Sequence, residues 1–189
     1  MAPAEGLGIT GFDINLSAGL TNIQSRDLLK RATNNGDVPD SLPTATVRIH
    51  KGLPLDFDIG AAYTAIPGTS AAAVSGEVKW SFVSGGTLTP AIAVRAFISR
   101  MSGLGDMKMH SQGADISISK GFAMATPYAG VGIVGSKAST DSGQWAKESY
   151  TQGRVFAGVN LNLAVLNIGL EADRTGDDTT FGLKLGWRF

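Results

Sequence analysis

The segment Phe12-Asp13-Ile14-Asn15-Leu16-Ser17-Ala18-Gly19-Leu20 alternates apolar with polar or small residues at every step. Successive side chains of a β-strand point to opposite faces, so this period of two predicts a strand with one apolar face and one polar face. The same alternation runs from Phe181 to Phe189. The pattern therefore predicts a strand near each end of the chain.

Eight further segments between these two repeat the alternation. They are residues 44–50, 55–63, 72–82, 92–99, 111–119, 129–133, 154–163 and 167–173. Together the ten segments predict a single all-β domain over residues 1–189. The sixth and seventh strands are open to a second interpretation, because the glycine-rich stretch 126–136 fits either phase, so eight strands remain the alternative.

The connections between these strands alternate in length. Short ones follow the second, fourth, sixth and eighth strands, at residues 52–54, 83–89, 123–126 and 164–166. Longer ones cover 23–43, 101–109 and 138–150, with short exceptions at 65–70 and 175–178. This alternation predicts an antiparallel up-and-down barrel with turns at one end and loops at the other. In the first loop, Ser25 is a candidate N-cap for a helical turn over Ser25–Ala32.

Composition excludes several classes of function. The 189 residues hold sixteen Lys and Arg against sixteen Asp and Glu, 17% charged residues in all, and no Cys. A chain without a basic footprint is not expected to bind nucleic acid. Without Cys it has no disulfide, thiol nucleophile or Cys-based zinc site. No stretch approaches the 18 apolar residues of a membrane-spanning helix, and the start of the chain is not a signal peptide, which we expect to have been removed.

Alternation fits two opposite barrels. A soluble barrel turns its apolar face inward, whereas a transmembrane barrel turns that face toward lipid and encloses a polar lumen. Aromatic residues on the apolar face favour the transmembrane form, because they collect near strand ends, as in the two girdles at membrane interfaces. These predicted interfacial aromatics are Tyr63, Trp80, Phe82, Phe122, Phe181, Trp187 and Phe189.

The polar face supports the same choice. Many of its positions are glycine, which leaves room for long side chains inside a narrow barrel. Its charges alternate in sign along neighbouring strands, which predicts ion pairing across a confined lumen. The predicted lumen network comprises Asp13, Arg48, Asp58, Glu77, Lys79, Arg95, Asp115, Glu171, Lys184 and Arg188. On the apolar face we expect long basic side chains only near strand ends, at Lys51 and Lys120.

The ending Phe181-Gly182-Leu183-Lys184-Leu185-Gly186-Trp187-Arg188-Phe189 resembles the C-terminal assembly signal of bacterial outer-membrane β-barrel proteins. The segment from Thr126 to Gly132 also resembles strands of small outer-membrane barrels. The resemblance implies a bacterial outer-membrane location, both termini in the periplasm, short turns inside and long loops outside. It implies outer-membrane lipid, lipopolysaccharide and the barrel assembly machinery as partners, and it identifies no subfamily.

Two sets of residues are candidate catalytic sites, since some small outer-membrane barrels are enzymes. His110, Ser111 and Asp106 would resemble the site of lipid-A-modifying barrels, but adjacent strand residues point to opposite faces. The omptin-like proteases pair acids with a histidine, and Asp177-Asp178 has no histidine nearby in sequence. We therefore assign no catalytic residue.

Simpler roles account for the other candidate residues. His50 is expected to be a lumen hydrogen-bonding partner of Asp56 and Asp58. A calcium site among Asp173, Asp177 and Asp178 is a weaker explanation than an exposed acidic turn. We assign no metal and no cofactor.

The sequence favours a barrel with a largely plugged lumen and a structural or surface-interaction role. A narrow pore for ions or small solutes is the alternative, and a lipid-modifying enzyme or protease is the third hypothesis. The loops offer a surface for a protein or lipopolysaccharide, at Leu28–Arg31, at Gln144-Trp145 and at Tyr150.

Overall fold

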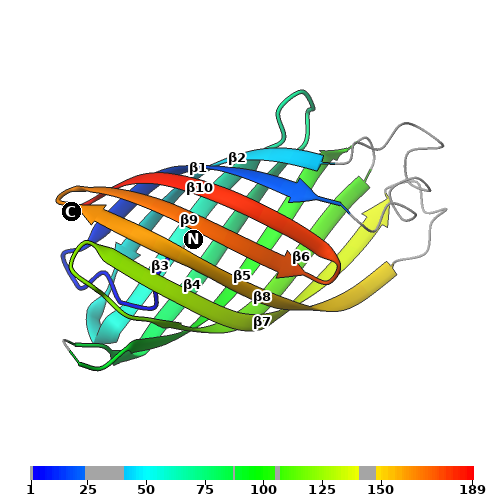
Figure 1. The fold of residues 1–189 in the computed structure, drawn as a ribbon. Coiled ribbons are helices and arrows are strands. Elements are labelled where there is room, and N and C mark those ends of the chain that lie inside the picture. Colours follow the sequence, from blue (N-terminus) through cyan, green and yellow to red (C-terminus); the bar gives the residue numbers. More distant parts are fainter. Residues whose placement is uncertain (1, 24–40, 87, 105–106, 141–147) are drawn as a thin grey trace.

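The computed structural model of the chain describes residues 2–23, 41–86, 88–104, 107–140 and 148–189. These residues form ten strands in one closed antiparallel barrel (Figure 1). The strands are β1 (Phe12–Asn22), β2 (Ser41–Gly52), β3 (Phe57–Ala65), β4 (Ala72–Ser84), β5 (Ala91–Leu104), β6 (Met107–Ser119), β7 (Ala125–Thr140), β8 (Glu148–Leu163), β9 (Leu166–Thr175) and β10 (Asp178–Arg188). The prediction of ten strands is confirmed over the alternative of eight. No helix in the described part of the chain is long and apolar enough to cross a membrane.

Every strand pairs with its neighbours in sequence, and β1 pairs with β10 to close the barrel. Leu16 lies opposite Val47 of β2 on one side and Leu185 of β10 on the other. Phe12 and Phe189 exchange backbone hydrogen bonds of 2.9 Å at the end of this seam. Closure satisfies the backbone donors and acceptors that an open sheet edge would leave unpaired in hydrocarbon.

The outer surface of the barrel is apolar and the inner surface is polar. Leu16, Val131 and Leu170 are more than half exposed, at 53%, 56% and 52%, whereas Asp13 and Lys184 are 2% and 1% exposed. A soluble domain has the opposite arrangement, and a continuous exposed apolar surface requires lipid. The chain is therefore a transmembrane β-barrel. The glycine-rich stretch 126–136 has a single phase, with Val131 facing outward and Tyr128 inward.

The strands differ from the predicted ones at both ends of the barrel. Strands β5 to β8 continue into the predicted loops 101–109 and 138–150. Backbone pairing continues there although the alternation of hydropathy has ended, because both faces of a strand beyond the lipid meet water. At the other end, β3 begins at Phe57 rather than Leu55, since Leu55 and Asp56 have positive φ angles of 63° and 58° and form a turn, η1 (Pro54–Asp56).

The connections that follow the even-numbered strands lie at one end of the barrel, which we call the turn end, and those that follow the odd-numbered strands lie at the opposite loop end (Figure 1). The predicted alternation in length holds only in part, because the connections 105–106 and 176–177 at the loop end have two residues each. The predicted helical turn at Ser25–Ala32 lies outside the described residues. So do two of the three predicted loop surfaces, Leu28–Arg31 and Gln144-Trp145.

The N-terminal segment, residues 2–7, enters the lumen from the turn end. Ala4 is completely buried there. Its backbone N–H donates to Ser119 Oγ at 3.0 Å. The Lys79 ammonium donates to the carbonyls of Pro3 and Glu5 at 3.1 and 2.8 Å. The alternation of the strands carries no sign of this insertion, because the segment makes its contacts with backbone groups.

Candidate functional site: the lumen

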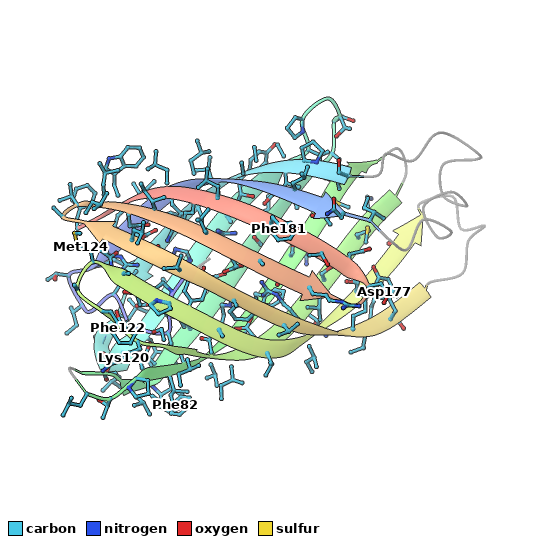
Figure 2. The ribbon with its side chains drawn as sticks, in the orientation of Figure 1. Phe82, Lys120, Phe122, Met124, Asp177 and Phe181 are labelled. Carbon is cyan, nitrogen blue, oxygen red and sulfur yellow. The ribbon has the colours of Figure 1, made fainter. Side chains whose placement is uncertain are left out.

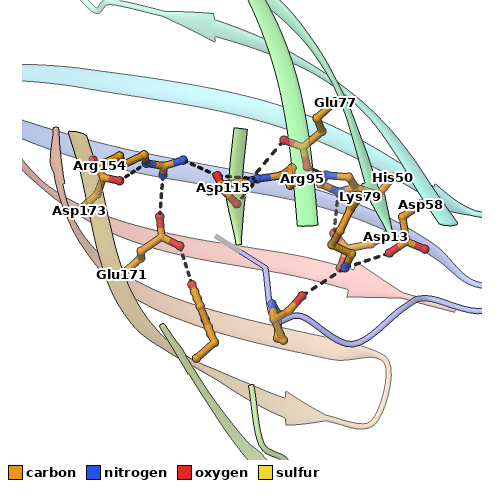
Figure 3. A network of polar contacts seen from close by, with 12 residues as sticks. Asp13, His50, Asp58, Glu77, Lys79, Arg95, Asp115, Arg154, Glu171 and Asp173 are labelled. Carbon is orange, nitrogen blue, oxygen red and sulfur yellow. Dashed lines mark hydrogen bonds and ion pairs between the residues drawn. The ribbon is translucent and has the colours of Figure 1, made fainter. Parts of the chain in front are cut away.

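A chain of charged side chains crosses the middle of the lumen (Figure 3). Asp115 of β6 is shared by two guanidinium groups. Arg95 Nη2 lies 2.6 Å and Arg154 Nη1 lies 3.2 Å from Asp115 Oδ2. The strand register brings the first pair together, since Arg95 and Asp115 are directly opposite each other on β5 and β6. Pairing offsets the cost of removing these charges from water.

The network continues from both arginines. Arg154 contacts Asp173 through Nε and Glu171 through Nη2, the latter at 3.8 Å. Tyr128 donates its hydroxyl hydrogen to Glu171 Oε2 at 2.8 Å. On the other side, Arg95 Nη1 lies 3.6 Å from Glu77 Oε2. The carboxylates and guanidinium groups therefore alternate across the barrel.

A histidine joins this chain to a second cluster nearer the turn end. His50 Nε2 lies 2.8 Å from Glu77 Oε1, and its Nδ1 lies 4.0 Å from Asp13 Oδ1. Arg188 Nε donates to Asp13 Oδ2 at 3.4 Å. The prediction that His50 binds Asp56 and Asp58 is therefore wrong. Asp56 is exposed in the η1 turn, where it accepts a hydrogen bond from Ser84 Oγ at 2.8 Å.

Eight of the ten predicted lumen residues make ion pairs or hydrogen bonds inside the barrel. Asp58 pairs with Lys79 at 2.9 Å, and the other six are described above. Arg48 and Lys184 face inward as well, but the described residues offer neither of them an ion pair. Lys184 is 1% exposed, and the Nη1 atom of Arg48 is buried without a hydrogen-bond partner among the described residues.

Two aromatic rings lie inside the lumen, where the alternation of hydropathy did not predict them. Phe97 of β5 and Phe156 of β8 face inward and lie against the central guanidinium groups. Arg154 lies 4.8 Å from the Phe156 ring centroid, and Arg95 lies 5.8 Å from the centroids of both rings. Such stacking is attractive because the face of the ring is electronegative. The signal was present in the sequence, since each phenylalanine follows an inward arginine by two positions and so shares its phase.

Two lumen glycines make room for these rings rather than for charges. A Cβ at Gly113 would lie 2.5 Å from Phe97 Cζ, and a Cβ at Gly130 would overlap the Phe156 ring. The expectation that glycine leaves room for charged side chains was therefore incomplete. Close approach of a ring to the opposite backbone is a recognised reason for glycine within a strand.

The free space in the lumen is very uneven. A cavity of about 20 Å³ lies among the charged groups and is lined by Glu77, Arg95 and Asp115. That volume holds roughly one water molecule. A second cavity, of about 600 Å³, lies at the loop end. Four serines share one register in its wall, Ser75, Ser99, Ser111 and Ser136. The lumen is therefore filled at its centre and open toward the loops.

The candidate catalytic and metal residues do not assemble. His110 lies on the outward phase of β6 and Ser111 on the inward phase, and Asp106 is outside the described residues. Asp173 is held by Arg154, whereas Asp177 lies on the surface with its Oδ1 at 3.9 Å from Arg174 Nη2. Within the described ranges, no three acidic or histidine side chains are grouped so that they could hold a metal ion.

The predicted interfacial aromatics all face outward. Their exposed fractions run from 43% for Trp80 and Phe82 to 68% for Phe189. Trp80 also stacks on Phe57, with ring centroids 5.6 Å apart and planes 7° apart. Figure 2 shows Phe82 and Phe122 near the turn end and Phe181 farther along the barrel. The remaining members, which also face outward, are Tyr63 and Trp187.

No protein-family model matches the chain, and no curated protein matches it. Solved structures of similar fold are bacterial outer-membrane proteins. One is a loop-deletion mutant of OmpT from Vibrio cholerae, at 12% identity and TM-score 0.42. The match covers 79% of this chain, which spans about half (54%) of that protein.

Two other similar structures match this chain over almost the whole length of both proteins. Ail, the attachment invasion locus protein of Yersinia pestis, was solved in complex with a heparin analogue. It is 11% identical at TM-score 0.39, over 98% of this chain and 99% of its own. The KdgM porin, in complex with disordered oligogalacturonate, is 7% identical at TM-score 0.46, over 94% and 99%.

Proposed function

We propose that this chain is an integral barrel of the bacterial outer membrane with a lumen closed to solutes, and that its role is structural or one of surface interaction. The observation that carries the proposal is the filled centre of the lumen, where about 20 Å³ remains among the charged groups. A hydrated ion needs far more room than a single water molecule. Passage would therefore require side chains of the network to separate.

Separating the network is costly. Breaking a buried ion pair by removing one partner destabilises a protein by about 3–5 kcal/mol, because the other charge stays buried and uncompensated. The guanidinium groups of Arg95 and Arg154 also lie within 6.0 Å of the centroids of both the Phe97 and Phe156 rings. The N-terminal segment adds a second obstruction at the turn end, with Ala4 fully buried. Two independent layers thus favour a closed lumen.

A surface role fits the loop end, where the 600 Å³ cavity opens. Hydroxyl groups line it, and Ser111 and Ser136 lie 2.9 Å apart through their Oγ atoms. Tyr150 contributes to the same wall and is 40% exposed. These groups support contact with a polar partner outside the cell. A narrow pore remains the second candidate, because the same cavity would be its outer entrance.

Planar-bilayer recordings separate the two candidates. We expect the reconstituted protein to show no discrete openings under conditions in which a known porin conducts. Reproducible openings of one size would contradict the closed lumen and favour the pore.

The surface role calls for its own experiment in native envelopes. A photo-crosslinking residue at position 150 should join the barrel to an outer partner. The same residue at position 88, where Leu88 is 91% exposed at the turn end, is the matched control. Identical adducts from both positions would argue against a partner at the loop end.

A further inference from the structure

Three basic side chains form a row on the outside of the barrel. Arg100 of β5 lies directly opposite His110 of β6, and His110 lies opposite Lys137 of β7. All three are exposed and lie on the outward phase of their strands. Neighbouring strands are about 4.8 Å apart, so the three side chains start within roughly 10 Å of one another. The row also corrects the expectation that Lys51 and Lys120 are the long basic side chains of the apolar face.

The described residues offer these three side chains no hydrogen bond and no ion pair. No described carboxylate side chain lies on the outward phase of β4 to β8. Arg174 of β9 is also outward at the loop end, but it lies 3.9 Å from Asp177 and donates to the Gly176 carbonyl. Arg100, His110 and Lys137 therefore differ from Arg174 in having no carboxylate partner among the described residues.

The depth of the row matches the edge of the lipid layer. Lys120, at the turn end, and His110 are ten residues apart along β6 and its turn. At about 3.4 Å per residue and a tilt of about 40°, this distance is roughly 26 Å along the barrel axis, close to the height of about 25 Å of a lipid-facing band. Just below the row lie Ile98 and Ile133, which are 66% and 60% exposed.

We propose that Arg100, His110 and Lys137 bind the phosphate group of a phosphorylated lipid in the outer leaflet, whose acyl chains lie on Ile98 and Ile133. The inference rests on the proposed outer-membrane location. Arginine donates two parallel hydrogen bonds to a phosphate, lysine adds a point charge and histidine adds an N–H donor. A lipid fits better than a soluble anion, because the basic row and the apolar surface are continuous on the same three strands.

The site is confined to one side of the barrel. At the loop end, β3 and β10 present Tyr63 and Phe181 instead, at 54% and 55% exposure. Aromatic rings are common at this depth of a membrane interface and need no specific ligand there. The difference between the two sides indicates a discrete lipid site rather than a general property of the loop end.

Native mass spectrometry of the detergent-solubilised full chain tests the proposal, with diphosphorylated lipid A as the probe. Two parallel titrations use the same lipid without its phosphates and inorganic phosphate alone. The variant is R100Q/K137Q, and R174Q is the matched control at the same end. We expect the double variant to bind lipid A with an affinity lower by about tenfold or more than that of the unmodified chain. The reason is that each charge-assisted hydrogen bond contributes about tenfold in affinity. We expect R174Q to retain lipid within twofold.

Three results would overturn the inference. They are equal retention by R100Q/K137Q, equal binding of the lipid without phosphates, and full displacement of the lipid by equimolar inorganic phosphate. The single variants R100Q and K137Q replace the double variant if far-UV circular dichroism shows that it does not fold. Failure of the proposed membrane location is separate, because it would appear as a protein that stays monodisperse without detergent.

Discussion

Asp115 holds the centre of the lumen because it accepts hydrogen bonds from two arginines at once. Asp115→Asn removes the charge and keeps the shape of the side chain. We expect it to lower the free energy of unfolding by about 3 kcal/mol, because two buried guanidinium groups lose their shared partner. Urea unfolding in lipid vesicles measures this change.

Lys184 provides the matched control for that variant. It is as buried as Asp115, but the described residues give it no ion pair. We expect Lys184→Met to leave the stability unchanged or to raise it, since methionine fills a similar volume without a charge. A loss as large as that of Asp115→Asn would show that burial, rather than pairing, determines the effect.

Gly113 is needed for the close packing of Phe97. We expect Gly113→Ala to destabilise the barrel by about 1–3 kcal/mol, because the new methyl group would overpack the site against the ring and the Ile133 carbonyl. Gly153→Ala is the control, since a Cβ there meets nothing within 4 Å. The same unfolding experiment compares them, and equal effects would contradict the role assigned to the ring.

The N-terminal segment is the element that closes the turn end. Its backbone is fixed by Lys79, by Ser119 and by Asp58, which accepts a hydrogen bond from the Leu7 N–H at 3.1 Å. Removing residues 2–7 would free this part of the lumen and leave all ten strands intact. We expect the truncated barrel to show no discrete openings in planar bilayers, because the charged network of Arg95, Asp115 and Arg154 still fills the centre of the lumen. Openings in the truncated barrel alone would show that the segment, rather than the network, closes the lumen. Leu55→Ala, a change at an exposed turn residue of the same end, is the control and should show no openings in the same recordings.

The positions of the ten strands were predictable from the sequence, whereas the residues at which β5 to β8 end toward the loops were not. Alternation located all ten strands because one face of each strand meets lipid and the other meets the lumen. Near Arg100, His110 and Lys137 the outward face is already polar, so the pattern stopped before the strands did. The insertion of residues 2–7 was not predictable either, because it depends on main-chain carbonyls such as those of Pro3 and Glu5, which any sequence would provide.

The barrel as a whole is expected to sit with its tryptophans at the edge of the lipid layer. Trp80 and Trp187 face outward at 43% and 44% exposure. Trp145 lies outside the described residues and is replaced in this experiment by Trp145→Phe. We expect lipids brominated near the headgroup to quench the remaining fluorescence more strongly than lipids brominated near the chain terminus, because indole rings settle at the interface. Stronger quenching from the chain terminus would contradict this placement.

The closed lumen of the barrel explains the balance of sixteen basic and sixteen acidic residues. Much of the described charge is enclosed in the lumen, where pairing offsets the cost of burial for most of these groups, with Arg48 and Lys184 as exceptions. The sequence predicted that pairing would occur and most of the residues involved. It did not predict that His50 would contact Glu77, since partners on β2 and β4 meet only after the barrel has closed.

The strands, their inward and outward faces and their antiparallel order could all be predicted from the amino-acid sequence, because they follow from a local period of two and from the lengths of connections. Three features became visible only in the folded barrel: which charges pair, where Phe97 and Phe156 lie against the arginines, and that the first residues of the chain fill the turn end. The fold also places three basic side chains in one outward row. These features depend on the register between strands and on the narrow diameter of the closed barrel, and neither is encoded within any single strand.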